Sequence, residues 1–445
     1  TAAREKPAYI IESGPAAGVI AAATVAREQQ LDRAITLDMG GTTAKLALIL
    51  DGLPEKTEDY EVGAGINLSS KLVTGAGYSV KLPFIDISEI GAGGGSIAWF
   101  DKGGALQVGP QSSASSPGPA CYDLGGLKAT FTDATLVLGY LNPDSLVGGA
   151  LKLNANKAQS VIRTQLCGQL DVSELKAAYA IYRIAVSNMI RAVKTVSTYR
   201  GHDPRDCTLI AFGGNGPIVA LAIAEDINIK RVIIPPNPGL LSASGLLWAD
   251  PEREVAQAFH GALARLTSSS IESGLATLVK DVSAMLSEDG YTFDAISFQR
   301  QLDMRYSGQA FELSVPVDKT ITDTAHLEAA FHYRYRQVYG HSQDSHPVEL
   351  VNIRVIAHVR RLSGNISLPF NPDRTKSMGT IPLERDAYFG PTFGSLCTPV
   401  ISRYDLLGAP QRGPLIIEEY DATCIVTPNC IVKLDDTDNI VIDRI

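Results

Sequence analysis

The sequence predicts an α/β protein followed by an α+β region that ends in a small β-rich domain. The first observation is a predicted strand, a glycine turn and a second strand over residues 33–50. The second is a strand, a glycine turn, a helix and a strand over residues 208–234, which together form an α/β unit. The third is a change in composition near residue 252. These observations divide the chain into an α/β core, an α+β domain and a small β-rich domain, at residues 1–252, 253–370 and 371–445.

Each predicted element follows from its residue types. Residues 14–29 predict a helix because Pro15 lies in the first turn and an Ala-rich apolar face follows. Apolar residues recur at helical spacing over 171–199, and Gly201 ends that helix. Residues 103–127 are rich in Gly, Pro and Ser and predict an ordered loop. The other predicted elements are strands over 33–38, 44–50, 208–212, 231–234, 296–304 and 309–316, helices over 218–224, 269–288 and 323–338, and a β-rich stretch over 57–85.

Composition argues against several classes of protein. Of the 445 residues, 45% are hydrophobic and 20% are charged, which is ordinary for a globular protein with sizeable cores. The formal net charge of −9 argues against a general nucleic-acid-binding protein. We recognise neither a membrane-spanning apolar stretch nor a secretory leader. The six cysteines include no C-x-x-C pair, so we expect a reduced, cytoplasmic protein. Together with the charge and the hydropathy, this leads us to expect no nucleic-acid or membrane partner.

A glycine turn with flanking hydroxyl and carboxyl groups lies between the first two predicted strands. Asp38 ends one strand, and Gly40, Gly41, Thr42 and Thr43 precede the next. Glycines let backbone N–H groups approach phosphate oxygens, and threonine hydroxyls add further donors. An aspartate at the strand end can hold a Mg²⁺-bound water or orient an attacking water. A plain hairpin with a Gly-Gly turn has the same short pattern, so the motif alone leaves both interpretations open.

A second glycine element, Phe-Gly-Gly-Asn-Gly-Pro at 212–217, lies between a hydrophobic strand and a helix. Such a turn lets a nucleotide base or ribose lie on the backbone, although a tight strand–helix connection needs similar glycines. The two elements together resemble the pattern of the actin, Hsp70 and sugar-kinase fold, in which they line one ATP cleft. The resemblance implies that the chain contains half of such a fold. It also implies that ATP contacts Gly213, Gly214, Asn215 and Gly216 as well as the first turn.

A third glycine-rich segment follows at residues 91–95. It can bind phosphate, or it can let two backbones pass closely, and the sequence favours neither interpretation. Asp86 and Glu89 precede it and are either metal ligands or solvated loop acids and caps.

Taken together, the motifs resemble the hydantoinase A/oxoprolinase family over almost the whole chain. The segments that carry the resemblance are ESGPAAG (12–18), LDMGGTT (37–43), GAGGGS (91–96), GPACY (118–122), TDA (132–134), GHDPRD (201–206), AFGG (211–214), PNPGLLSA (236–243), MRYSGQ (304–309), GP (413–414) and IIEEY (416–420). The family includes 5-oxoprolinases, N-methylhydantoinases and caprolactamases, and related acetone and acetophenone carboxylase subunits.

The resemblance implies ATP-dependent chemistry in which a poorly electrophilic oxygen is phosphorylated. It also implies Mg²⁺ or Mn²⁺, with Asp38 as catalytic residue and metal ligand, a small-molecule substrate and a B-type partner subunit in a hetero-oligomer. Family members usually begin with another Asp-x-Gly-Gly-Thr loop upstream of the region seen here. We therefore expect either that the N-terminal half is on another chain or that this chain is a fragment of a longer protein. Ser88 replaces a histidine that many hydantoinase-type relatives carry, which puts a metal site of the same form in doubt.

Four further residues have open roles. Cys121 is either a ligand or nucleophile or a buried small residue, and no nearby sequence element supplies an activating His. His202 follows the long predicted helix and is favoured as a structural turn residue. Arg305 and Gln309 lie on a predicted strand pair, where they either face substrate or anchor the second domain.

Three functions fit these features. The motif set favours the A-type subunit of an ATP-dependent hydrolase of cyclic amides such as hydantoin, 5-oxoproline or a lactam. The absence of the His at position 88 gives some support to a ketone carboxylase subunit. A non-catalytic scaffold, which docks onto a complete paralogue, is the third interpretation.

Overall fold

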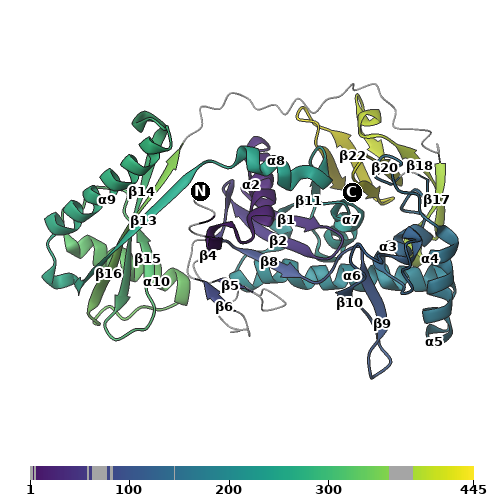
Figure 1. Ribbon diagram of the computed structural model, residues 1–445, viewed down its shortest axis with the longest axis horizontal. Helices are drawn as coiled ribbons and strands as arrows, with labels where there is room; N and C mark the ends of the chain where they lie inside the picture. The colour runs from purple at the N-terminus through teal and green to yellow at the C-terminus, as the bar shows by residue number, and fades with distance from the viewer. Residues whose placement is uncertain are drawn as a thin grey trace. The chain divides into compact units, whose positions relative to one another are not determined.

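The computed structural model describes residues 4, 7–57, 60–62, 78–80, 84–144, 146–359 and 384–445. The chain divides into two compact units (Figure 1). Unit 1 comprises residues 1–249 and 372–445, and unit 2 comprises residues 250–371. Unit 2 is therefore inserted between the two parts of unit 1. Helices and mixed sheets make up both units, so the predicted α/β fold class is confirmed.

A nine-stranded sheet is the centre of unit 1, with the order β19-β22-β23-β12-β11-β1-β2-β3 and with β8 paired to β2. Strands β1, β11 and β12 are parallel, and β1 and β2 form an antiparallel hairpin. The strands are β1 (Arg33–Met39), β2 (Ala44–Leu50), β3 (Leu53–Pro54), β8 (Ile87–Ile90), β11 (Thr208–Phe212), β12 (Arg231–Ile234), β19 (Gln411–Arg412), β22 (Cys430–Leu434) and β23 (Ile440–Arg444).

Helices cover both faces of this sheet (Figure 1). Ile35 and Leu37 of β1 belong to the core that contains α6 and α7, whereas Ala34 belongs to the core that contains α2 and α8. Burial on both faces explains why β1, β2 and β11 read as continuous apolar runs. The helices of unit 1 are α2 (Ser13–Glu28), α3 (Phe131–Val137), α4 (Ala155–Ile162), α5 (Gly168–Leu170), α6 (Glu174–Val196), α7 (Gly216–Ile227), α8 (Leu241–Trp248) and α11 (Gly390–Phe393).

Smaller sheets complete unit 1. The predicted loop over 103–127 contains the strand β10, because Leu106 to Val108 pair with β9 in a hairpin. The predicted β-rich stretch over 57–85 lies partly outside the described residues. These strands are β4 (Lys56–Thr57), β5 (Tyr60–Val62), β6 (Tyr78–Val80), β7 (Phe84–Ile85), β9 (Ser96–Phe100), β10 (Leu106–Ser112), β17 (Glu384–Tyr388), β18 (Ser395–Ile401), β20 (Leu415–Glu418) and β21 (Thr423–Val426).

The end of the chain differs from the predicted separate domain over 371–445. Four of its strands form a sheet of their own in the order β17-β18-β20-β21, but β19, β22 and β23 extend the main sheet. Strand β23 pairs with β12, and Ile440, Val441 and Ile442 are buried between the two layers of helices and their neighbours. A pairing between segments about two hundred residues apart leaves no local pattern, which is why the sequence suggested a separate domain.

In the described part of unit 2, two α-helices pack on an antiparallel sheet. Its sheet order is β13-β16-β14-β15, and apolar residues of α9 and α10 share one core with Leu302, Met304 and Ile353 of the sheet. The predicted strand over 309–316 is shorter, because residues 307–312 form turns and an irregular segment. The elements are β13 (Glu252–Ala262), α9 (Ser268–Glu288), β14 (Ile296–Tyr306), β15 (Leu313–Pro316), α10 (Thr324–Tyr339) and β16 (Val348–Val359).

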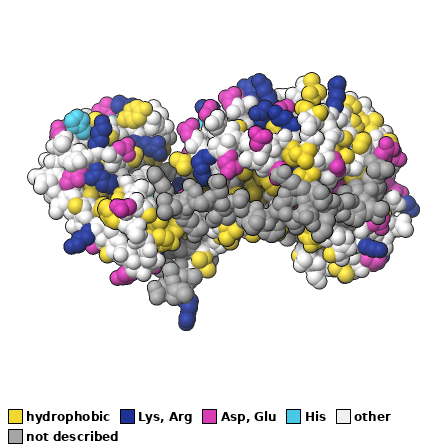
Figure 2. All heavy atoms as spheres, turned by 90° about the horizontal axis from the view of Figure 1, so that it is seen from above, with side chains coloured by type: hydrophobic (Ala, Val, Ile, Leu, Met, Phe, Trp, Pro, Cys, Tyr) yellow, Lys and Arg dark blue, Asp and Glu magenta, His cyan; other side chains and the backbone are white. Residues whose placement is uncertain are grey.

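The surface carries both signs of charge. Figure 2 shows Lys and Arg side chains interspersed with Asp and Glu on the face that it draws. Among the described residues, no helix is both long and apolar enough to cross a bilayer.

One buried ion pair fastens the end of the chain to the main sheet. Arg403 is only 4% exposed, and its Nη2 donates to Glu419 Oε2 at 2.8 Å. The same guanidinium donates to the carbonyls of Ile234 at 3.1 Å, Pro235 at 2.9 Å and Asp438 at 2.7 Å. Because these carbonyls end β12 and precede β23, Arg403 joins the two strands to the turn that holds Glu419.

Replacing Arg403 by Ala should lower the free energy of unfolding by about 3–5 kcal/mol, since Glu419 would remain as an unpaired buried charge. Urea unfolding measures this loss. Removing the exposed partner of Asp203 by Arg205→Ala is the control and should cost under about 1 kcal/mol. A loss for Arg403→Ala no larger than that of the control would contradict the role of the pair.

Candidate functional site

Three connecting segments meet at one edge of the main sheet. The parallel strands β1, β11 and β12 all end there, and ligands of open α/β sheets bind outside the carboxyl ends of such strands. The segments are residues 40–43 after β1, 213–215 after β11 and 235–240 after β12.

The turn over residues 40–43 is held by the two other glycine-rich elements. Gly40 O accepts from Gly94 N at 3.0 Å and from Asn215 Nδ2 at 3.1 Å, and Gly41 O accepts from Gly95 N at 2.6 Å. Asn215 N also donates to Met39 O at 2.9 Å. All three glycine-rich elements are therefore in direct contact: the turn over residues 40–43, the turn over residues 213–215 and the segment 91–95.

Only glycine permits these close approaches. A Cβ on Gly93 would lie 2.5 Å from Thr42 N, and a Cβ on Gly213 would lie 2.5 Å from Met39 O and 2.6 Å from Asp38 Oδ1. Gly213 also has a φ of +77°, a conformation that glycine adopts without strain. The sequence left two interpretations of segment 91–95 open, phosphate binding and the close passage of two backbones. These contacts support the second.

The outer side of the same turn is open. A Cβ on Gly40 or Gly41 would have no neighbour within 4 Å. Within the described part of the chain, the backbone amides of Gly41, Thr42 and Thr43 donate to no backbone carbonyl. Successive free amides in an open turn form a concavity suited to an anion such as phosphate.

Asp38 lies beside this turn in a protected environment. Ser242 Oγ, from the start of α8, donates to Asp38 Oδ2 at 3.5 Å. Burial raises the pKa of the Asp38 carboxyl, and the nearby charge of Lys45 partly offsets this effect. Lys45 is opposite Asp38 in the hairpin, and its Nζ donates to Thr43 Oγ1 at 2.8 Å and pairs with Glu89 at 3.1 Å. A carboxylate and an ammonium thus flank the open turn.

The acids that precede segment 91–95 are engaged in ion pairs. Glu89 pairs with Lys45, and Asp86 is buried in an ion pair with Arg200. Ser88 is fully buried, and its Oγ has no hydrogen-bond partner in the described chain. In the ranges that the structure describes, no group of three or more His, Cys, Asp or Glu side chains has a metal-binding arrangement.

Two family models match the chain. The model described as "Hydantoinase/oxoprolinase" matches residues 1–255, and the "Hydantoinase/oxoprolinase C-terminal domain" matches residues 262–441. The chain belongs to the hydantoinase/oxoprolinase family. The resemblance seen in the sequence motifs is therefore confirmed.

Curated relatives include an uncharacterized protein of Methanocaldococcus jannaschii, 38% identical over 97% of this chain and 62% of the relative. The caprolactamase subunit alpha of Pseudomonas jessenii is 33% identical over 97% of this chain and 61% of its own length. The acetophenone carboxylase gamma subunit of Aromatoleum aromaticum is 29% identical over 95% and 58%. The chain thus spans about three fifths of the length of these relatives.

Solved structures show the same fold. The crystal structure of ATP-dependent caprolactamase from Pseudomonas jessenii matches with a TM-score of 0.77 and 32% identity, over 97% of this chain and 61% of the other. The nucleotide-free structure of acetone carboxylase matches with a TM-score of 0.76 and 24% identity, over 97% of this chain and 61% of the other. The second likeness concerns the fold alone.

Another family motif, TDA at 132–134, has a structural role that the sequence did not suggest. Asp133 is fully buried and accepts hydrogen bonds from Thr130 N at 2.9 Å, Thr130 Oγ1 at 2.7 Å and Cys121 N at 2.7 Å. It closes a capping box at the start of α3, and the Thr-x-x-Asp spacing was the available signal. Burial, together with the charge of Asp133, raises the pKa of the Cys121 thiol, which disfavours a thiolate nucleophile there.

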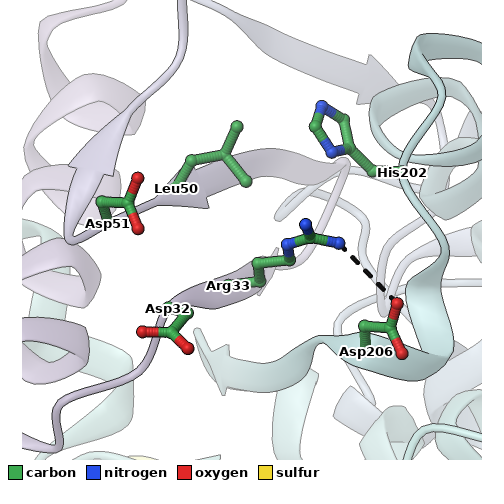
Figure 3. Close-up of a pocket in the computed structure, with 6 residues that line it drawn as sticks. All are labelled: Asp32, Arg33, Leu50, Asp51, His202 and Asp206. Carbon is green, nitrogen blue, oxygen red and sulfur yellow. Dashed lines mark ion pairs between the residues drawn. The ribbon is translucent and has the colours of Figure 1, made fainter.

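The other candidate residues of the family motifs lie away from the turn. His202 lines a hollow of about 530 Å³ with Asp32, Arg33, Leu50, Asp51 and Asp206. Figure 3 shows Arg33 reaching toward Asp206, at an Nη1–Oδ2 distance of 3.7 Å. Arg33 pairs with Leu50 at the opposite end of the hairpin from Gly40, about 20 Å along the strand.

In unit 2, the two residues with open roles both have internal partners. Arg305 Nε donates to Glu349 Oε2 at 3.1 Å, and Gln309 Nε2 donates to Tyr335 OH at 2.8 Å. These contacts support a structural role within unit 2.

Replacing Gly213 by Ala should destabilise unit 1 by more than its backbone strain alone. The control Gly104→Ala has a similar φ of +80° with open space around the new Cβ, and should cost about 1–2 kcal/mol. Gly213→Ala should cost about 1–3 kcal/mol more, because the Cβ meets Met39 O and Asp38 Oδ1. Chemical unfolding of both variants tests this, and equal losses would contradict the close packing.

Proposed function

We propose that this chain is the nucleotide-binding part of the A-type subunit of an ATP-dependent hydrolase of cyclic amides. The observation that carries the proposal is the open turn over residues 40–43, which lies where three parallel strands end. In the described chain, its amides at Gly41, Thr42 and Thr43 donate to no backbone carbonyl. The family supports it, because the relatives include a caprolactamase subunit alpha and a solved caprolactamase named as ATP-dependent.

Each residue of the site has a proposed task. The amides of Gly41, Thr42 and Thr43, with the two threonine hydroxyls, hold phosphate oxygens, and Gly40 leaves the open side of the turn free for them. Residues 213–216 let the nucleoside lie against the backbone between β11 and α7. The space that a Cβ on Gly40 or Gly41 would fill fits such a ligand.

Asp38 is the proposed catalytic residue and metal ligand. Its carboxylate would bind a Mg²⁺ or Mn²⁺ ion directly or through water, and such an ion supplies charge neutralisation at the phosphates. Burial raises the pKa of Asp38, so its charged form lacks full hydration and gains most from a nearby cation. Lys45 is placed to attract the negative charge of a phosphate beside Thr43.

The proposed reaction overcomes the poor electrophilicity of an amide. The carbonyl oxygen of the ring attacks the terminal phosphorus, the bond from that phosphorus to ADP breaks, and the amide becomes an imidate phosphate. Water then adds to the carbon, and the C–N bond breaks as the nitrogen takes a proton, which leaves an acyl phosphate. A second water attacks the acyl carbon, and phosphate leaves with the former carbonyl oxygen to give the ring-opened carboxylate. The site contributes positioning and charge neutralisation for the phosphoryl transfer.

The complete enzyme needs further parts. We propose that residues outside this chain form the second wall of the ATP cleft and that a B-type subunit completes a hetero-oligomer. The greater length of the curated relatives supports the first point. We also propose a cytoplasmic location, since the cysteines described are all free.

A ketone carboxylase subunit is the second candidate. The fully buried Ser88 stands where we expected a histidine in hydantoinase-type relatives, and the relatives include acetophenone and acetone carboxylase subunits. In that reaction, phosphorylation would activate the enolate and bicarbonate for C–C bond formation.

Isotope transfer in the assembled complex separates the two candidates. A cyclic amide labelled with ¹⁸O at the carbonyl should give ring-opened product and ¹⁸O-labelled phosphate, one labelled phosphate per ADP formed. Incorporation of labelled bicarbonate with a ketone, and no ring opening of hydantoin, 5-oxoproline or a lactam, would instead favour the carboxylase.

Gly41→Ala should weaken ATP binding without loss of stability. Its Cβ points into open space and meets no protein atom within 4 Å, so the fold accepts it. The methyl group occupies the proposed phosphate position, and we expect a loss of about tenfold or more in affinity. Calorimetry measures binding, with the exposed helical Gly168→Ala as control. Unchanged ATP affinity would exclude phosphate from this turn.

Asp38→Asn should abolish ATP turnover and leave the fold at least as stable at pH 7. Because burial raises the pKa of Asp38, ionisation costs folding free energy as pH rises through that pKa, and Asn avoids this cost. The stability difference should vanish below about pH 3.9, where the unfolded carboxyl is also protonated. Unfolding curves across pH and turnover by the complex test this. Unchanged turnover would favour the scaffold interpretation.

A further inference from the structure

The turn between β20 and β21 lies against the ends of β11 and β12. Glu419 N donates to Ala422 O at 3.0 Å, which closes this turn over residues 419–422. Asp421 Oδ2 accepts from Gly239 N at 2.8 Å, and Asp421 O lies 3.6 Å from the position of a Cβ on Gly214. A segment from the end of the chain therefore borders the second glycine turn.

A tyrosine in this turn is supported on one side and open on the other. A Cβ on Gly148 would lie 2.5 Å from Tyr420 Cδ2, so the ring packs directly on the Gly148 backbone. The φ of +60° at Gly148 further restricts that position to glycine. Tyr420 is nevertheless 52% exposed. A fixed aromatic ring with an exposed surface is a platform on which a planar group can stack.

The neighbouring Asp421 is half-buried, and its charge is poorly solvated. Burial is the main cause that raises the pKa of its carboxyl, and the charge of Glu419 raises this pKa further. The backbone N–H of Gly239 stabilises the ionised form through its hydrogen bond to Oδ2. A carboxylate in this setting gains from an added hydroxyl donor.

Contacts connect this turn to the open turn at the end of β1. Asn215 Nδ2 donates to Gly40 O at 3.1 Å, and Gly214 precedes Asn215 in the chain. Residues 214 and 215 therefore lie between the open turn and Asp421, on the side where we propose that the nucleoside lies. Tyr420 is the residue before Asp421, so the Cα atoms of the two residues are about 3.8 Å apart.

We infer that Tyr420 and Asp421 recognise the nucleoside of the bound nucleotide. Tyr420 stacks on the base, and Asp421 accepts a hydrogen bond from a ribose hydroxyl. This inference rests on the proposed ATP site and adds the residues that distinguish a nucleotide from its phosphates. The recognition unites the two parts of unit 1, because the phosphate turn is near the start of the chain and the nucleoside contacts are near its end.

Binding of ATP and of inorganic tripolyphosphate to the assembled complex tests the inference by calorimetry. Tyr420→Ala should weaken ATP binding about tenfold or more, as stacked bases do on alanine substitution, and should leave tripolyphosphate affinity unchanged. Tyr420→Phe should retain ATP affinity. Tyr199→Ala removes a 76% exposed tyrosine of the same unit and should change neither ligand.

The ribose contact has its own comparison. Wild type should bind ATP more tightly than 2′,3′-dideoxy-ATP, and Asp421→Ala should bind the two nucleotides equally. Equal binding of both nucleotides by wild type would overturn the role of Asp421.

The outcomes separate this inference from the proposed function. Tight ATP binding by Tyr420→Ala, within twofold of wild type, would overturn the role of Tyr420 and leave the ATP site intact. Equal loss of ATP and tripolyphosphate in Tyr420→Ala would assign the tyrosine to the fold, which also overturns its role in stacking. Failure of wild type to bind either ligand would overturn the inference together with the ATP site.

Discussion

Direct backbone contact between three glycine-rich segments is the constraint on which the candidate site depends. Gly94 and Gly95 donate to the carbonyls of the first turn, and Asn215 donates to Met39 O and Gly40 O. No side chain separates these backbones, because a Cβ at Gly93 or Gly213 would collide with them. With its carbonyls engaged on the inner side, the turn presents its amides on the outer side, and the peptide dipoles there favour an anion.

The second constraint comes from the end of the chain. Arg403 joins the ends of β12 and β23 to Glu419, and the residues after Glu419 border Gly214 and Gly239. One buried guanidinium therefore fixes both a strand of the main sheet and the turn beside the candidate site. Such a group is costly to desolvate, and its hydrogen bonds to carbonyls and carboxylate offset that cost.

Much of the fold could be predicted because its signals are local. The apolar runs of β1, β2 and β11, the helical spacing of α6 and the paired glycines at 40–41 and 213–214 each lie within a short window. The contact between Asp133 and Cys121 N, the contacts of Arg403 and the pairing of β23 with β12 could not be predicted. They join residues that are adjacent only after folding, and Arg403 looks like any surface arginine in the sequence. Strand β10 was missed because glycine, proline and serine dominate its surroundings.

The position of β23 has a consequence for how the protein is made. On the ribosome, β12 emerges about two hundred residues before β23, and the whole of unit 2 is synthesised between them. Until Ile440–Arg444 leave the exit tunnel, the nascent sheet has β12 as an unpaired hydrophobic edge. Unit 2 has its own core and can fold during this interval. The main sheet of unit 1 is therefore completed only after unit 2 has been synthesised. A ribosome that stalls before residue 440 has emerged would release a chain with an open sheet edge, which is a substrate for chaperones and a template for aggregation.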